Sequence, residues 1–164
     1  MAESLKNAVD SEEDDMKGRF LTFLVDKELY GIGLRNVMEI VGIQPITQMP
    51  EVPDYIKGIV NLRGKIIPVM DVRLRFKKPG QDYHDRTCII VIDYKGLSIG
   101  LIVDSVSEVL AIPDEDIVDK PEINSRGSRG YISSVGKIGE RVILLLDCEK
   151  LMSAEELELI ASEL

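Results

Sequence analysis

The residue best suited to acid–base chemistry is the single histidine, His84, which stands between Asp82 and Asp85. Flanking carboxylates can orient an imidazole as a general base, but such a site also needs a nucleophile and groups that stabilise an oxyanion. Neither is recognisable near His84. The acidic run Asp114–Asp116 follows Pro113, and a polar turn explains it without a substrate. We therefore expect a solvated linker histidine and no enzyme.

Cofactor chemistry is also weakly represented. Gly31-Ile32-Gly33 lacks the third glycine and the following helix of a dinucleotide fingerprint. The segment 126–130 combines arginines with glycines and could meet phosphates, but a soluble surface loop is the simpler interpretation. Cys88 and Cys148 lack a CxxC spacing and a histidine-rich neighbourhood, so they indicate core residues rather than a zinc site. The sequence predicts no cofactor and no metal.

The charge of the chain is unevenly distributed. The 29 acidic and 20 basic residues give a net charge of −9, and the tails account for all of it, with −5 in residues 1–15 and −4 in residues 153–164. We expect residues 1–16 to form a disordered acidic extension. No signal peptide opens the chain, and apolar runs such as 142–146 are too short to span a membrane. These features predict a cytoplasmic protein without membrane insertion.

Two charge blocks remain inside the neutral body. Residues 57–78 carry seven bases and one acid, and residues 104–122 carry seven acids and one base. Such blocks can steer a charged partner or pair with each other. A nucleic-acid-binding β-barrel is an alternative for the basic block, but only Phe76 offers a ring on which bases could stack.

The elements that must position these side chains are mainly strands. Ile and Val number 35 against 17 Leu, and β-branched residues pack well on pleated surfaces. Short apolar runs on either side of polar turns predict hairpins over 20–32 and 88–103. The spacing within 34–41 favours a short helical turn that leads into a strand. A capping box at Ser153 and an amphipathic pattern predict a helix over 153–164.

An internal repeat connects the two halves of the chain. The hairpins align with each other, which places Glu39 on Glu108, and the later strands align so that Asp71 falls on Asp147. The pattern predicts two β lobes of about five strands each, over about 17–78 and 86–152, with a Pro/Gly linker between them. Lobes this small gain stability by packing together along an apolar seam.

The most specific segment is Lys57–Asp71, which is typical of strand, tight turn and strand. Asn61 suits turn geometry, and Pro68 indicates that its strand is an edge or is bulged there. Arg63 lies beside the turn, where its five-donor guanidinium can serve solubility or bind a partner's carboxylates and carbonyls.

Over about residues 17–152 the chain resembles the CheW family of bacterial chemotaxis coupling proteins. The motifs that carry the resemblance are Lys57–Asp71, Tyr30-Gly31-Ile32, Val37–Val41 and Val103–Leu110. The resemblance implies two interlocked SH3-like five-stranded β-barrels and no catalysis. It also implies an adaptor that couples transmembrane chemoreceptors to the histidine kinase CheA through the kinase's CheW-like regulatory domain. A coupling protein of a related non-chemotactic sensory pathway is the alternative within the same fold.

The resemblance also implies which residues bind each partner. The positions matching kinase contacts are Val37, Met38, Glu39 and Ile40, and those matching receptor contacts are Gly58, Asn61, Arg63 and Val103. Structural roles stay open, since Val37 suits a core and Gly58 a close strand approach. Val37 and Glu39 are expected on one face of a strand, at the rim of an interface. We expect two separate binding surfaces on a protein that is monomeric when free and recruited to receptor arrays by its partners.

Overall fold

The computed structural model describes residues 16–119, 130–152, 156 and 158. Nearly all of the expected acidic extension and of the 126–130 loop lies outside the described residues, as does most of the expected C-terminal helix. Glu156 and Glu158 have helical backbone. None of the helices in the described residues is long and apolar enough to cross a membrane.

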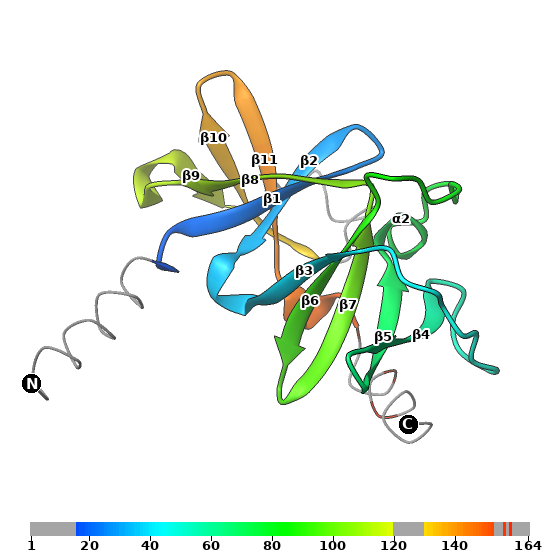
Figure 1. The fold of residues 1–164 in the computed structure, drawn as a ribbon. Coiled ribbons are helices and arrows are strands. Elements are labelled where there is room, and N and C mark those ends of the chain that lie inside the picture. Colours follow the sequence, from blue (N-terminus) through cyan, green and yellow to red (C-terminus); the bar gives the residue numbers. More distant parts are fainter. Residues whose placement is uncertain (1–15, 120–129, 153–155, 157, 159–164) are drawn as a thin grey trace, which may run out of the picture.

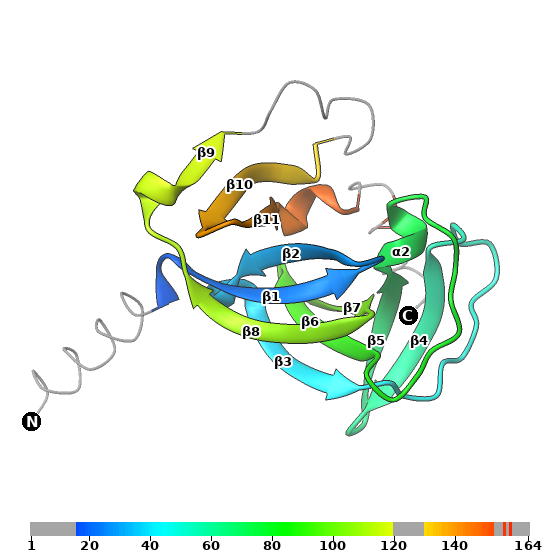
Figure 2. The same cartoon turned by 90° about the horizontal axis from the view of Figure 1, so that it is seen from above.

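The predicted mainly β fold is confirmed, and the strands form two sheets (Figures 1 and 2). The six-stranded sheet has the order β8-β1-β2-β11-β10-β9, and the five-stranded sheet has the order β3-β6-β7-β5-β4. The strands of the first are β1 (Arg19–Val25), β2 (Glu28–Gly33), β8 (Ser105–Ala111), β9 (Ile117–Asp119), β10 (Ile132–Ile138) and β11 (Arg141–Leu146). Those of the second are β3 (Val37–Gly42), β4 (Ile56–Leu62), β5 (Lys65–Asp71), β6 (Cys88–Tyr94) and β7 (Leu97–Val103).

The two interlocked sheets match the architecture implied by the resemblance, but they do not close into five-stranded barrels. The short strand β9 adds a sixth member to one sheet, and each sheet ends in two edge strands that are not hydrogen-bonded to each other. Short helices occupy the connections, namely η1 (Leu34–Asn36), α2 (Val72–Arg75), η2 (Asp114–Asp116) and η4 (Cys148–Lys150). The helical turn predicted before β3 is confirmed by η1.

The two halves of the chain exchange hairpins, which interlocks the sheets. The β1–β2 hairpin pairs with β8 and β11 from the second half, and the β6–β7 hairpin pairs with β3 and β5 from the first half. Both junctions between hairpin and later strands are parallel and occupy equivalent places in the repeat. Val69 pairs with Gly100 in one sheet, and Leu145 pairs with Gly31 in the other.

Gly31 on β2 and Gly100 on β7 lie at the two parallel junctions, where they allow neighbouring side chains to pack closely. A Cβ at Gly100 would lie 2.6 Å from Ile89 Cγ2 and 2.9 Å from Val69 Cγ1. Real Cβ contacts essentially never fall below 3.0 Å, so only glycine fits here without a shift of its neighbours.

Among the residues that the structure describes, three apolar clusters fill the interior. The largest joins both sheets and includes Phe23, Ile32, Ile90 and Leu101, each fully or almost fully buried. A second cluster packs on the five-stranded sheet, around side chains that include Val69 and several others from β4 to β7. A third, around Ile143, packs on the six-stranded sheet. Because the first cluster draws on both sheets, the lobes share one hydrophobic core.

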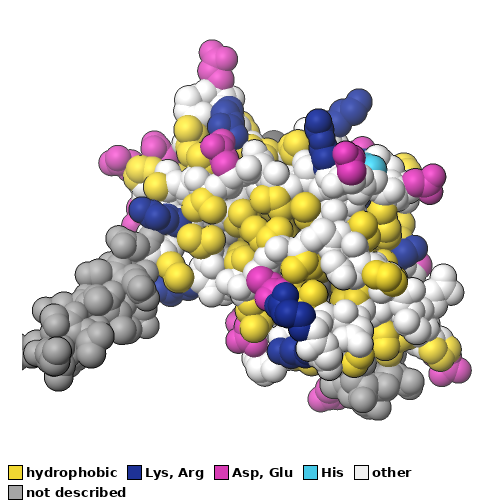
Figure 3. Space-filling view, viewed as in Figure 1, with side chains coloured by type: hydrophobic (Ala, Val, Ile, Leu, Met, Phe, Trp, Pro, Cys, Tyr) yellow, Lys and Arg dark blue, Asp and Glu magenta, His cyan; other side chains and the backbone are white. Residues whose placement is uncertain are grey.

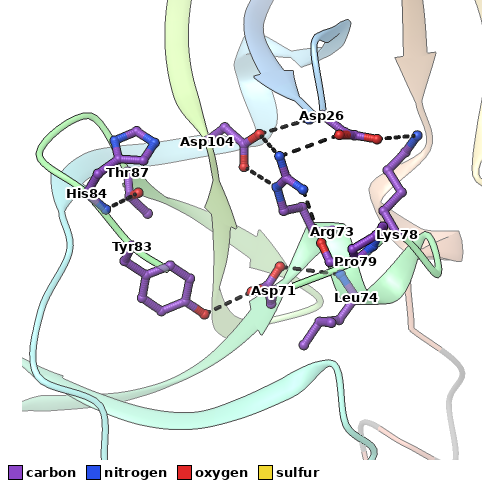
Figure 4. Close-up of polar contacts among 10 residues, drawn as sticks. All are labelled: Asp26, Asp71, Arg73, Leu74, Lys78, Pro79, Tyr83, His84, Thr87 and Asp104. Atoms are coloured by element: carbon purple, nitrogen blue, oxygen red, sulfur yellow. Dashed lines mark hydrogen bonds and ion pairs between the residues drawn. The ribbon is translucent and has the colours of Figure 1, made fainter. Parts of the chain in front are cut away.

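A polar clasp of Asp26, Arg73, Lys78 and Asp104 also joins the sheets (Figure 4). Arg73 donates from Nε to Asp104 Oδ1 at 2.8 Å and from Nη2 to Asp104 Oδ2 at 2.9 Å. Asp26 lies in the β1–β2 turn, 3.6 Å from Arg73 and 3.5 Å from Lys78, and its amide donates to Asp104. The basic and acidic charge blocks therefore pair with each other here, as one of the two sequence interpretations allowed.

Gly58 lies where the loop after β3 crosses β4. Thr47 and Ile59 form an isolated bridge with N–O distances of 2.8 and 2.9 Å. Gly58 has φ +144°, and a Cβ there would lie 2.0 Å from the carbonyl oxygen of Thr47. Gly58 therefore has a structural role, because only a residue without a side chain allows the backbone of Thr47 to lie this close to β4.

We predict that Gly58→Ala lowers the free energy of unfolding by about 2 kcal/mol or more, because the new Cβ meets the Thr47 carbonyl in a strained backbone conformation. Urea unfolding followed by circular dichroism measures the change. Gly42→Ala is the matched control, since a Cβ at Gly42 meets no atom within 4 Å. Equal losses for both variants would contradict the assignment.

A second prediction concerns Asp104. Burial alone would raise the pKa of its carboxyl, but hydrogen bonds from Arg73 and from the Asp26 amide outweigh burial and hold the pKa below its ordinary value. The unfolded carboxyl titrates near pH 4, so this contribution is complete above about pH 5 and is lost as the pH falls through the folded pKa. Asp104→Asn should lower the free energy of unfolding by roughly 2 kcal/mol at pH 7.

Urea titrations at pH 7, 5 and 3 test this expectation. The Asp104→Asn variant should lose less stability on acidification than the wild type does, because it lacks the carboxyl that must be protonated. Asp82→Asn, in the exposed part of the linker, serves as the control. An Asp104→Asn variant as stable as the wild type at pH 7 would show that the clasp contributes nothing.

Candidate partner-binding site

The edge strand β3 contains a bulge that decides which way its side chains point. Val37 pairs with Ile92, whereas Glu39 pairs with the adjacent residue Val91, so two steps on β3 match one step on β6. Directly paired residues lie on the same face of a sheet. Val37 therefore faces the first cluster with Ile92, and Glu39 faces the second with Val91. The expectation that Val37 and Glu39 share a face is wrong, because the bulge breaks the period of two.

The strand β3 also carries two exposed apolar side chains. Met38 is 54% exposed and Ile40 is 43% exposed, whereas Val37 is half-buried against the core. Met38 is held by Ser98, whose hydroxyl lies 3.6 Å from the Met38 sulfur. Exposed large apolar residues on an edge strand are suited to contact a partner.

The β4–β5 turn has the predicted strand, turn, strand structure. Asn61 shapes it, since its Oδ1 accepts a hydrogen bond from the Gly64 amide at 2.8 Å. Arg63 has φ +53° and projects a side chain that is 69% exposed. Ile66, which follows the turn, is 44% exposed. Pro68 lies where β5 pairs with β4 alone, so the strand is an edge at the proline, as predicted, and becomes central from the next residue onward.

The structure brings Glu39 and Arg63 into contact although they come from different elements. Arg63 Nη2 donates to Glu39 Oε1 at 2.6 Å and also contacts Oε2. Beside this ion pair lies a pocket of about 260 Å³ that Met38, Val91 and Ser98 help to line. The residues expected to bind the kinase and those expected to bind the receptor therefore adjoin, and Glu39 and Arg63 do not lie on two separate surfaces.

Two of the expected receptor contacts are not displayed on this surface. Val103 is 2% exposed and packs in the first cluster, so its side chain offers no area for a receptor to touch. Gly58 is buried beneath Thr47. Sequence reasoning singled out Val103 because it opens a motif, but β7 is a central strand of its sheet and buries the residue.

The sequence reasoning missed a second surface that the repeat could have indicated. Glu108 on β8 is the equivalent of Glu39, and Arg141 at the start of β11 donates to its Oε1 at 3.2 Å. Val109 and Val142 beside this pair are 47% and 53% exposed. Figure 3 shows hydrophobic side chains exposed across the face on which β8, β1 and β3 lie in front. The alignment of Glu39 with Glu108 was the available signal.

His84 makes local turn contacts. Its Nδ1 accepts a hydrogen bond from the Arg86 amide at 3.0 Å, and its own amide donates to Thr87 Oγ1 at 2.9 Å (Figure 4). The ring lies 3.8 Å from Asp85, whose side chain is almost fully exposed. These contacts suit a residue that shapes the linker.

The fold and this surface define a class of protein: a rigid β domain that presents apolar and charged side chains from a sheet edge and a turn. The profile described as the CheW-like domain matches residues 19–156. The chemotaxis protein CheW of Klebsiella aerogenes is 40% identical over 141 residues, which cover 86% of this chain and 85% of the relative. That of Bacillus subtilis is 31% identical and covers 84% of this chain and 88% of the relative.

A solved structure agrees with these relatives. The crystal structure of the scaffolding protein TtCheW from Thermoanaerobacter tengcongensis superposes with a TM-score of 0.78 at 32% identity, over 85% of this chain and 94% of that one. The chain belongs to the CheW family.

We predict that Arg63→Ala changes the free energy of unfolding by less than about 1 kcal/mol, because an ion pair this exposed contributes little to stability. Thermal and urea unfolding provide the measurement, with Arg73→Ala as the internal comparison. Arg73 has a side chain that is 13% exposed and a two-point contact with Asp104, so its loss should cost clearly more. Equal effects of the two substitutions would mean that Arg63 is a structural residue.

Proposed function

We propose that this protein is a non-enzymatic adaptor that couples transmembrane chemoreceptors to the histidine kinase CheA. The observation that carries the proposal is the contact between Glu39 and Arg63 beside the exposed Met38, while Ile40 on the same edge strand and Ile66 after the β4–β5 turn are exposed as well. Curated relatives named as chemotaxis proteins, and a solved relative described as a scaffolding protein, support the same function. The adaptor lies in the cytoplasm and reaches receptor arrays through its partners.

The kinase contact is apolar in this proposal. Met38 and Ile40 are large, exposed and carried by the edge strand of a packed sheet, so they need little reorganisation to bind. A preorganised apolar surface loses less entropy on association than a flexible one does. The CheW-like regulatory domain of the kinase is the partner that we assign to this strand.

The receptor contact depends on Arg63. Its guanidinium is held in place by Glu39 but keeps most of its surface in water, so a receptor carboxylate or carbonyl can share it. Because Glu39 lies next to Met38, the two binding regions are contiguous. A partner that draws Arg63 away from Glu39 changes the electrostatic environment of the other partner's binding region.

Nucleic-acid binding is less well supported, because three cations of the basic block are paired with carboxylates of the chain and only Phe76 offers a ring for stacking in this block. Arg63 pairs with Glu39, Arg73 pairs with Asp104, and Lys78 lies 3.5 Å from a carboxylate oxygen of the β1–β2 turn. Each of these pairs engages a cation that a phosphate would otherwise contact.

Binding assays with single variants test the proposal. We expect Ile40→Asp to weaken binding to the kinase regulatory domain by about tenfold or more, because a desolvated carboxylate replaces an exposed apolar contact. Arg63→Asp should weaken binding to a receptor cytoplasmic fragment by a similar factor. Val118→Asp, on β9 and 41% exposed, is the control that should leave both affinities unchanged. Val37 is a poorer probe than Ile40, because its aspartate variant would also disturb the core.

The charge-exchanged double variant separates two roles of Arg63. If only the ion pair matters, E39R/R63E should recover the binding that each single exchange loses. If the guanidinium itself contacts the receptor, the double variant should stay defective in receptor binding, which is the result that we expect. Unchanged binding of both partners by Ile40→Asp and Arg63→Asp, in folded variants, would refute the proposed surface.

A further inference from the structure

A basic pocket lies away from the candidate partner-binding site, between α2, η4 and the residues that precede β4 and β10. Its volume is about 860 Å³, and its charged lining consists of four bases, Arg75, Lys77, Lys78 and Lys150, and two acids, Asp54 and Glu156. None of residues 37–40 or 61–66 lines it. A pocket this size with several cations suits an anionic peptide or ligand.

Equivalent residues of the two halves of the chain meet at the base of the pocket. Tyr55 and Tyr131 are equivalent in the repeat, and each carbonyl accepts a hydrogen bond from the aspartate that ends the following hairpin, at 2.7 Å from Asp71 and 2.8 Å from Asp147. The Arg75 guanidinium carbon lies 4.7 Å from the ring centroid of Tyr55 and 4.4 Å from that of Tyr131. The two tyrosines therefore hold the guanidinium between them.

Arg75 is fixed further by hydrogen bonds. Its Nε donates to the carbonyl oxygen of Leu151, and its Nη1 donates to the Tyr131 hydroxyl. The positive charge at the base of the pocket is thus immobile, and binding an anion there requires little rearrangement.

Two lysines add positive charge at the rim. Within the described part of the chain, neither Lys77 nor Lys150 forms an ion pair. Lys77 has φ +60° in the turn that follows α2, and Lys150 ends η4, so both are carried on structured turns. An acidic segment that entered the pocket would meet both lysines.

The chain carries such a segment directly after η4. Residues 153–164 contain four glutamates and no base. One of them, Glu156, lines the pocket. Burial raises the pKa of the Tyr55 phenol most, and the nearby Glu156 carboxylate raises it further, so this glutamate lies close to the tyrosine that stacks on Arg75.

We propose that this pocket is a binding site for an acidic peptide and that the chain's own C-terminal segment, residues 153–164, is its resident ligand. Glu156 is the anchoring residue, Arg75 and the two tyrosines form the base, and Lys77 and Lys150 bind the remaining carboxylates. A tethered segment acts at an effective concentration on the order of millimolar, so it excludes competing acidic peptides that bind more weakly.

A fluorescein-labelled synthetic peptide of residues 153–164 tests the proposal by fluorescence anisotropy against the full chain. The variant E155Q/E156Q/E158Q/E163Q should bind the peptide at least about tenfold more tightly than the wild type does, because its own segment competes poorly for the pocket. Adding K77E/K150E to that variant should abolish binding. The matched control K17E/K137E reverses two exposed lysines elsewhere and should leave binding intact.

Three results would overturn the proposal. They are equal affinity of the peptide for the wild type and the glutamine variant, absence of binding to either, and binding that K77E/K150E does not reduce. A peptide with glutamine at all four glutamate positions checks that the contact is electrostatic, and its affinity should fall as that of the lysine variant does. Because Arg63 and Ile40 are intact in every chain, the result is independent of the proposed adaptor function.

Discussion

The exchange of hairpins between the two halves of the chain is the constraint on which the rest of the structure depends. Each sheet is completed by a parallel junction, Val69 with Gly100 or Leu145 with Gly31, between strands far apart in the sequence. The apolar cluster shared by both sheets stabilises this arrangement. The ion pair of Arg73 with Asp104 stabilises it further, because it joins a residue before the linker to one after it. Each sheet contains strands from both halves and the sheets share one apolar cluster, so surfaces on the two sheets keep a fixed relation, which is what a scaffold requires.

The candidate site takes its form from a local departure from regular pairing. Without the bulge in β3, Glu39 would face the first cluster with Val37 and could not reach Arg63. The bulge turns it towards the β4–β5 hairpin while Met38 and Ile40 remain exposed. Bulges are common where a strand must re-aim a side chain, and this one places Glu39 beside Arg63 and Met38. Arg75 holds the comparable central place at the basic pocket, between the tyrosines of the two halves.

Much of this fold could be predicted from the residues. Alternating apolar runs and turn residues indicate the hairpins at 20–32 and 88–103, and the repeat correctly anticipates equivalent strands in both halves. The hairpin exchange was implied only by the family resemblance, because pairing between distant strands leaves no local pattern. The bulge, the burial of Val103 and the contact of Glu39 with Arg63 depend on register and sheet curvature, which residue spacing does not encode.

The central claim is that one rigid domain holds a kinase and a receptor at the same time through contiguous surfaces. Sedimentation velocity of the full chain, mixed with the kinase regulatory domain and a receptor cytoplasmic fragment, tests it most directly. The account predicts a ternary complex that contains all three components. It also predicts that Ile40→Asp removes the kinase from that complex and Arg63→Asp removes the receptor. Two binary complexes that compete for the chain, with no ternary species at saturating concentrations, would contradict it.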